Sequence, residues 1–155
     1  MIYQGKIEKN NYKIAIIISK FSLEICERLL KGTLVGLEQY TNPENIDIYW
    51  VPGAFEIPRI AKTILSKEHN YDAIITLGCV IRGETTHYDY VCNETSRQIS
   101  NLGVDYNIPV IFGVLTTENI NQALKRSDID EIKNNKGYYC ALAAIEMVDI
   151  LNKIK

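Results

Sequence analysis

A histidine stands in a short polar turn between an apolar run and an apolar helical stripe. The segment runs from residues 73–77 through a turn that contains Gly83 to Thr86, His87 and Asp89. Thr86 and Asp89 have the spacing of a capping box, which predicts Thr86 as the N-cap of a helix with His87 in its first turn. Unpaired amides at a helix N-terminus attract anions, and imidazole transfers protons near neutral pH. The segment therefore predicts a phosphate site beside an acid–base group, although a first-turn histidine is also often a plain surface residue.

Three further candidates follow other apolar runs. Phe21 comes after residues 14–18 and is either a core aromatic or a stacking platform for a planar ring. Glu56 lies in the otherwise apolar segment 51–60, so its carboxylate needs donors, which sugar hydroxyls or an ion pair with Arg59 would supply. Cys79 stands where an apolar run meets the histidine turn, as a wall residue or a reactive thiol.

Two cations later in the chain are candidates for the same anion. Arg126 ends a helix predicted to begin near Thr117, where a cation also simply complements the helix dipole. Lys136 precedes Gly137 in a polar turn and is otherwise a solvated lysine. Spacing in the sequence does not decide whether either side chain reaches the histidine turn.

Composition excludes several classes of function. The chain has 155 residues and a net charge of −2, so it carries no basic field for nucleic acid. The start has no apolar signal core and no run has membrane-spanning length, which predicts a soluble, cytoplasmic protein. The four cysteines and two histidines lack metal-ligand spacing, and no Walker loop, dinucleotide fingerprint or nucleophile triad is present. We therefore expect no metal site.

Short β-branched runs alternate with helical stripes along the whole chain. Runs at residues 14–18, 46–51, 73–77 and 110–114 predict strands, and three of them are apolar enough to be covered on both faces. Apolar residues at helical spacing cover residues 23–37, 91–102 and 141–151. This alternation predicts one domain over residues 1–155, a three-layer α/β/α sandwich around a four-stranded parallel sheet. Ligands of such sheets bind outside the carboxyl ends of the strands.

Five segments, taken together and in this order, resemble the family of 6,7-dimethyl-8-ribityllumazine synthases. They are Ser19–Phe21, Val51–Pro58, Leu77–Val91, Pro109–Asn119 and Asn135–Gly137. The resemblance implies a flavodoxin-like fold and a transferase of riboflavin biosynthesis. Its reaction would condense 5-amino-6-(D-ribitylamino)uracil with 3,4-dihydroxy-2-butanone 4-phosphate to the lumazine, with release of phosphate and water. The resemblance implies that this reaction needs no metal and no organic cofactor.

The resemblance also implies roles for individual residues. Phe21 would stack on the pyrimidine, and His87 would transfer protons. The remaining pyrimidine and ribityl contacts would come from Ala54, Phe55, Glu56, Cys79, Val80 and Ile81, and from Phe112 and Lys136 of a neighbouring subunit. Phosphate would bind at Glu84, Thr85, Thr86 and Arg126. The implied partners are the two substrates and other copies of the chain, as a pentamer or an icosahedral shell of pentamers, with riboflavin synthase as a further possible associate.

The sequence departs from the family pattern at two places. Ser22 stands where the family commonly has Asn, which would weaken a polar contact to the substrate. The connection between Arg126 and Lys136 is about two residues longer than the usual bacterial pattern and lacks its glycines. We expect the longer connection to disfavour the shell and to leave pentamers.

Three other interpretations stay open at this stage. The chain would also suit a flavodoxin-like module that binds a flavin without turnover, since fold does not dictate function. It would further suit a shell or carrier without catalysis, or a riboflavin synthase of the archaeal type. The presence of Glu56, His87 and Arg126 argues against a carrier that has lost catalysis. The string Arg82–His87 matches the lumazine synthases better than the archaeal type of riboflavin synthase.

Overall fold

Four strands rich in β-branched residues form one parallel sheet in the computed structural model, which describes residues 1–155. The strands lie in the order β2-β1-β3-β4. Their bounds are Ile14–Ser19 (β1), Ile46–Val51 (β2), Ala73–Ile81 (β3) and Val110–Thr117 (β4). Ile16 of β1 pairs in register with Ile48 on one side and Ile75 on the other. The predicted parallel sheet is confirmed.

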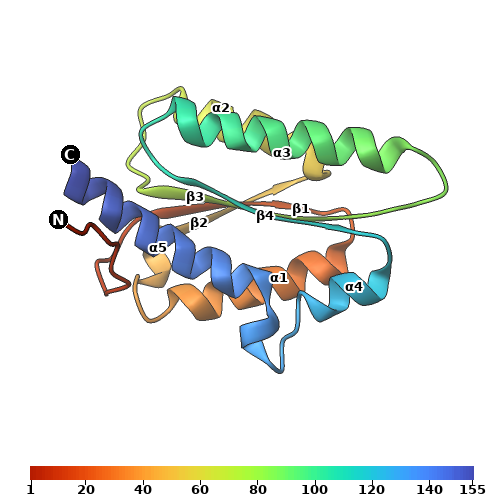
Figure 1. The fold of residues 1–155 in the computed structure, drawn as a ribbon, viewed down its shortest axis with the longest axis horizontal. Helices are drawn as coiled ribbons and strands as arrows, with labels where there is room; N and C mark the ends of the chain where they lie inside the picture. Colours follow the sequence, from red (N-terminus) through yellow and green to blue (C-terminus); the bar gives the residue numbers. More distant parts are fainter.

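Five α-helices cover the two faces of this sheet. They are α1 (Leu23–Leu37), α2 (Ile57–Leu65), α3 (His87–Asp105), α4 (Ile120–Lys125) and α5 (Lys136–Ile154), with short 3₁₀ turns at Pro43–Asn45, Ala54–Glu56 and Ile132–Asn134. Helices α2 and α3 lie on one face, and α1, α4 and α5 on the other (Figure 1). The predicted three-layer α/β/α sandwich is therefore also confirmed.

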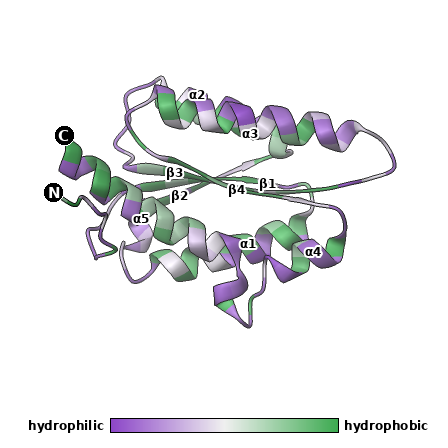
Figure 2. Cartoon of the chain, in the orientation of Figure 1, coloured by the Kyte–Doolittle hydropathy of each residue, from purple (hydrophilic) through white to green (hydrophobic).

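The alternation of side chains along β1 builds two cores, one on each face. Ile14, Ile16 and Ile18 pack toward α1 and α5, while Ala15 and Ile17 pack toward α2 and α3. All five residues are fully buried. Burial of one isoleucine side chain contributes about 1.5–3 kcal/mol, so this strand anchors both layers. The helices, by contrast, alternate between hydrophilic and hydrophobic residues along their length (Figure 2).

Two details differ from the sequence interpretation. The run that forms β4 is not covered on both faces, because β4 is an edge strand and Val110, Ile111 and Phe112 stay partly exposed. The helix α2 was not predicted, although Ile57, Ala61 and Leu65 recur every four residues and form its buried face.

The strand order places a crevice at one end of the sheet. The neighbours β1 and β3 are followed by helices on opposite faces, α1 below and α3 above (Figure 1). Their connections separate at the carboxyl ends of these strands, which is where ligands of open α/β sheets bind. No helix in the chain combines the length and the apolar character needed to cross a membrane.

Candidate functional site

A cavity of about 510 Å³ opens at the carboxyl ends of β1, β2 and β3, beside the first turns of α3. Nine residues predicted as site residues line it, namely Phe21, Ala54, Phe55, Glu56, Cys79, Val80, Ile81, Thr85 and His87. They come from four separate segments of the sequence. The crossover topology has therefore brought together most of the predicted residues at one place.

Phe21 lies on the rim of the cavity, two residues beyond β1. Its backbone amide donates to the carbonyl of Pro52 at 3.1 Å, which ties the end of β1 to the end of β2. The ring is 74% exposed, so the interpretation as a core aromatic is wrong. An exposed ring at a cavity rim has a free face on which a planar ligand can stack.

Glu56 lies in the short 3₁₀ turn between β2 and α2, and its side chain is exposed in the cavity. No ion pair joins its carboxylate to Arg59. The alternative in which Arg59 neutralises Glu56 is therefore wrong. The free carboxylate is able to accept hydrogen bonds from hydroxyl groups of a ligand.

Cys79 forms part of the cavity floor and is 2% exposed. Burial, together with the neighbouring Cys26, raises the pKa of its thiol to about 12. The thiol therefore stays protonated at neutral pH, and a protonated thiol is a poor nucleophile. This favours the interpretation of Cys79 as a residue of the cavity wall over its interpretation as a reactive thiol.

The turn before α3 leaves its backbone donors free. The amides of residues 83–86 donate no hydrogen bond within the chain, and the amide of His87 reaches only Thr85 Oγ1, at 3.4 Å. These residues are exposed at the positive end of a 19-residue helix. Free amides at such an end are a suitable site for phosphate.

Thr86 is the N-cap residue of α3, as predicted, but the predicted capping box is wrong. Thr86 has φ −74° and ψ 0°, and its side chain makes no capping hydrogen bond. An N-cap hydroxyl normally reaches the helix amides from an extended backbone conformation, which Thr86 does not adopt. The Asp89 carboxylate binds Arg82 instead.

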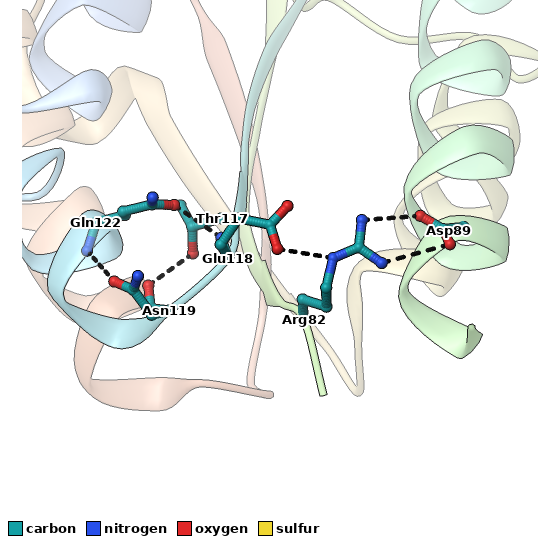
Figure 3. Close-up of polar contacts among 6 residues, drawn as sticks. All are labelled: Arg82, Asp89, Thr117, Glu118, Asn119 and Gln122. Atoms are coloured by element: carbon teal, nitrogen blue, oxygen red, sulfur yellow. Dashed lines mark hydrogen bonds and ion pairs between the residues drawn. The ribbon is translucent and has the colours of Figure 1, made fainter. Parts of the chain in front are cut away.

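Arg82 connects three elements at the edge of the cavity (Figure 3). Its guanidinium donates to Glu118 Oε2 at 2.8 Å and to Asp89 Oδ1 at 3.1 Å. It also lies 4.3 Å from the centroid of the Tyr88 ring. Hydrogen bonds with Asp89, and next with Glu118, raise the pKa of Arg82 above its usual value. Glu118 is held in turn, because its amide donates to Gln122 Oε1.

Five of the predicted residues do not line the cavity. Glu84 and Thr86 belong to the adjacent turn, whereas Phe112, Arg126 and Lys136 lie elsewhere. The amide of Lys136 donates to the carbonyl of Arg126 at 2.8 Å, so these two residues are neighbours at the start of α5. Phe112 lines a separate groove of about 480 Å³ between β4, α3 and Met147 of α5. The cavity of one chain therefore contains none of these three side chains.

Five residues that line the cavity were not among the predicted site residues, namely Gly53, Gly83, Tyr88, Tyr90 and Val91. Tyr90 and Val91 follow His87 by three and four residues, so a helix that begins at residue 87 places all three on one face. Gly53 and Gly83 stand in the segments after the second and third apolar runs, so their place at a strand end was itself a signal.

The chain has no group of three or more histidine, cysteine or acidic side chains placed to hold a metal ion. The family model described as 6,7-dimethyl-8-ribityllumazine synthase matches residues 11–152 of the chain. The matched range includes every residue that lines the cavity.

Proposed function

Because the chain belongs to the 6,7-dimethyl-8-ribityllumazine synthase family, we propose that it is a cytoplasmic transferase that forms this lumazine as one catalytic domain over residues 1–155. The substrates are 5-amino-6-(D-ribitylamino)uracil and 3,4-dihydroxy-2-butanone 4-phosphate. One observation carries the proposal: an exposed aromatic ring, a free carboxylate and a histidine converge on one cavity beside four unpaired amides. These groups match the ring, hydroxyl and phosphate chemistry of the two substrates.

The order of steps follows from the substrates. The amine of the pyrimidine attacks the ketone and forms an imine with loss of water. Phosphate then leaves with the electrons of its C–O bond, after a proton is removed from the adjacent carbon. The enol that remains takes up a proton at its terminal carbon and becomes a ketone. The second amine attacks this ketone, closes the ring, and the ketone oxygen is lost as water. His87 moves the protons, because an imidazole near neutral pH accepts and returns them.

Each part of the cavity has one task in this scheme. Phe21 stacks on the pyrimidine, and Glu56 accepts hydrogen bonds from the ribityl hydroxyls. The free amides of residues 83–86 bind the phosphate and stabilise its charge as it leaves. Because the protein holds both substrates together, much of the acceleration comes from proximity, so loss of His87 slows turnover without abolishing it.

Phe112, Arg126 and Lys136 complete the cavity of a neighbouring copy in this proposal. None of the three lines the cavity of its own chain, and Arg126 adjoins Lys136 at the start of α5. Contacts of this heterologous kind generate closed rings, which agrees with a pentamer. The connection before α5 packs against α1, where Arg28 Nε donates to the carbonyl of Ser127. We retain the expectation of pentamers without a shell; light scattering that gives megadalton particles would overturn it.

The direct test mixes purified protein with both substrates and follows lumazine fluorescence and phosphate release together. We expect equal amounts of both products, a kcat about a hundredfold lower in His87→Ala, and an unchanged rate in the matched control His69→Ala. His69 is the other histidine of the chain and lies outside the cavity. Ring binding without product above the spontaneous rate would favour a flavodoxin-like binding module instead.

A second test asks whether Arg126 acts in a neighbouring copy. Arg126→Ala should raise the KM for the phosphate substrate about tenfold. His87→Ala and Arg126→Ala chains are then unfolded, mixed in equal amounts and refolded together. If one site takes His87 from one copy and Arg126 from the next, about a quarter of the mixed sites regain both groups. No gain over the separate variants would mean that Arg126 acts within its own chain or not at all.

A further inference from the structure

Arg82 makes more polar contacts at the cavity edge than any residue that lines it. It directly follows β3, and its amide donates to the carbonyl of Thr117 at the end of β4, at 2.9 Å. Its guanidinium then binds Glu118, which follows β4, and both oxygens of Asp89, in the first turn of α3. One side chain therefore fixes the end of two strands to the start of the helix that carries His87 (Figure 3).

The two carboxylates around Arg82 determine whether its guanidinium is available to bind a ligand. One guanidinium contacts two carboxylates, those of Asp89 and Glu118. Both pairs are half-exposed, so each contributes little to the free energy of unfolding. The contacts use Nε, Nη1 and Nη2, which leaves few donors for a ligand. Arg82 is consequently poorly suited to bind phosphate itself.

The contacts of Arg82 also affect the charge and the orientation of the chain around the turn at residues 83–86. Asp89 places a carboxylate in the first helical turn, next to the turn at residues 83–86 whose amides are free for an anion. The guanidinium neutralises this carboxylate and, through Tyr88 and Asp89, fixes the direction of the first turn. Without it, Asp89 and Glu118 would repel an anion bound at residues 83–86.

We propose that Arg82 is a positioning residue that neutralises Asp89 and orients the first turn of α3, and thereby keeps the turn at residues 83–86 able to bind the phosphate of the substrate. The inference rests on the proposed function for the identity of the substrate. It assigns to Arg82 an indirect role, distinct from the direct contact expected of Arg126.

The test varies each substrate in turn, at a saturating concentration of the other and at low ionic strength. Arg82→Ala should raise the KM for the phosphate substrate about fivefold, with the KM for the pyrimidine substrate unchanged. Adding Asp89→Asn to Arg82→Ala should recover part of that loss, because the unneutralised carboxylate is gone. Arg82→Lys should lie between the wild type and Arg82→Ala, since it keeps the charge without the planar fork.

Arg97→Ala is the matched control. Arg97 is an arginine on the same helix, paired with Glu94, and it lies outside the cavity. Its removal should leave both KM values unchanged. A purely structural role of Arg82 would lower kcat and raise both KM values together, with no recovery by Asp89→Asn, and this result would overturn the proposal.

Calorimetric titration with inorganic phosphate separates this inference from the proposed function. We expect wild-type protein to bind phosphate more tightly than Arg82→Ala, with the difference reduced at high salt. This result in a protein that makes no lumazine would refute the proposed function and support the role of Arg82. Equal phosphate affinity of the two proteins, in an active synthase, would refute the role of Arg82 alone.

Discussion

The two longest helices of the molecule, α3 and α5, begin in opposite ways. Each has 19 residues and follows a polar turn, on opposite faces of the sheet. The start of α5 is capped, and in that sense closed, by the buried Asn135, whose side chain accepts hydrogen bonds from two amides of the helix. The start of α3 has Thr86 at the same position without a side-chain cap, and the amides of the turn before it, residues 83–86, stay free.

The closed start consists of four hydrogen bonds from one side chain. Asn135 Oδ1 accepts from the amides of Gly137 at 2.8 Å and Tyr138 at 3.3 Å. Its Nδ2 donates to the carbonyls of Arg28 and Asp128, both at 3.0 Å. The comparison teaches that a helix N-terminus serves stability when the chain satisfies its donors, and is available to a ligand when the chain does not.

Asn135→Ala should give the largest loss of stability. It leaves two amides and two carbonyls without partners at a fully buried position, which costs about 3 kcal/mol in the free energy of unfolding. Thr86→Ala should change the free energy of unfolding by less than about 0.5 kcal/mol, because the Thr86 side chain makes no capping hydrogen bond. Thermal unfolding at fixed protein concentration measures both, with the exposed Asn134→Ala as control. Equal losses of stability in Thr86→Ala and Asn135→Ala would contradict the conclusion that only the start of α5 is capped by its side chain.

Alanine in place of glycine tests the same contrast through packing. A Cβ at Gly137 would lie 2.0 Å from the carbonyl oxygen of Leu29, so Gly137→Ala must push α5 away from α1. We expect a loss of about 2–3 kcal/mol. A Cβ at Gly83 meets nothing within 4 Å, so Gly83→Ala should leave the melting temperature nearly unchanged. A large drop at Gly83 would show that the turn before α3 is as tightly packed as the start of α5.

The start of α1 provides a smaller test. Ser22 is its N-cap, has φ 59° and ψ 50°, and makes no capping hydrogen bond. Asn tolerates this left-handed conformation better than Ser, which gives a conformational reason for the Asn that the family commonly has there. Ser22→Asn should raise the free energy of unfolding by about 0.5 kcal/mol, measured by thermal unfolding. A decrease would indicate that the residue at this position serves the ligand and not the backbone.

Acid should weaken the connection before α5 through Asp128. The amides of Asp130, and next of Glu131, hold the pKa of the Asp128 carboxyl below its ordinary value of 3.8. A lowered folded-state pKa stabilises the protein above pH 3.8, and this contribution is lost as the pH falls through the lower folded value. Asp128→Asn should therefore show a flatter decline of melting temperature between pH 5 and the folded pKa than wild type. An equal decline of melting temperature in the two proteins over this pH range would show that the Asp128 carboxylate does not contribute to the acid sensitivity.

Much of the fold was readable from local pattern. The runs at residues 14–18 and 73–77 are nearly all aliphatic. Short continuous runs of this kind are typical of parallel strands that are buried on both faces. The helical stripe at residues 23–37 coincides with α1. The exposed face of β4 could not be predicted, because its position at the sheet edge depends on the order of all four strands.

The candidate site was readable in part, for a related reason. Residues in the connections that follow strands, such as Phe21 and Glu56, were placed correctly at the cavity because parallel strands end at one edge of the sheet. Arg126 and Lys136 also follow elements, but those elements lie in the other layer and their side chains do not line the same cavity. The partner of Asp89 was missed because Arg82 and Thr86 both have the reach to bind it, and only the backbone angles of Thr86 decide between them.

The sequence by itself determined the four strands, most of the helices, their layering, and several of the turns that line the cavity. These properties follow from hydrophobic periodicity and residue type, which act over a few neighbouring residues. Only the tertiary structure decided that the amides before α3 stay open, that Asn135 closes α5, and that Arg82 joins Asp89 to Glu118. The contacts of Asn135 and Arg82 reach groups 107 and 36 residues away in the chain, which the crossovers of the sheet bring together.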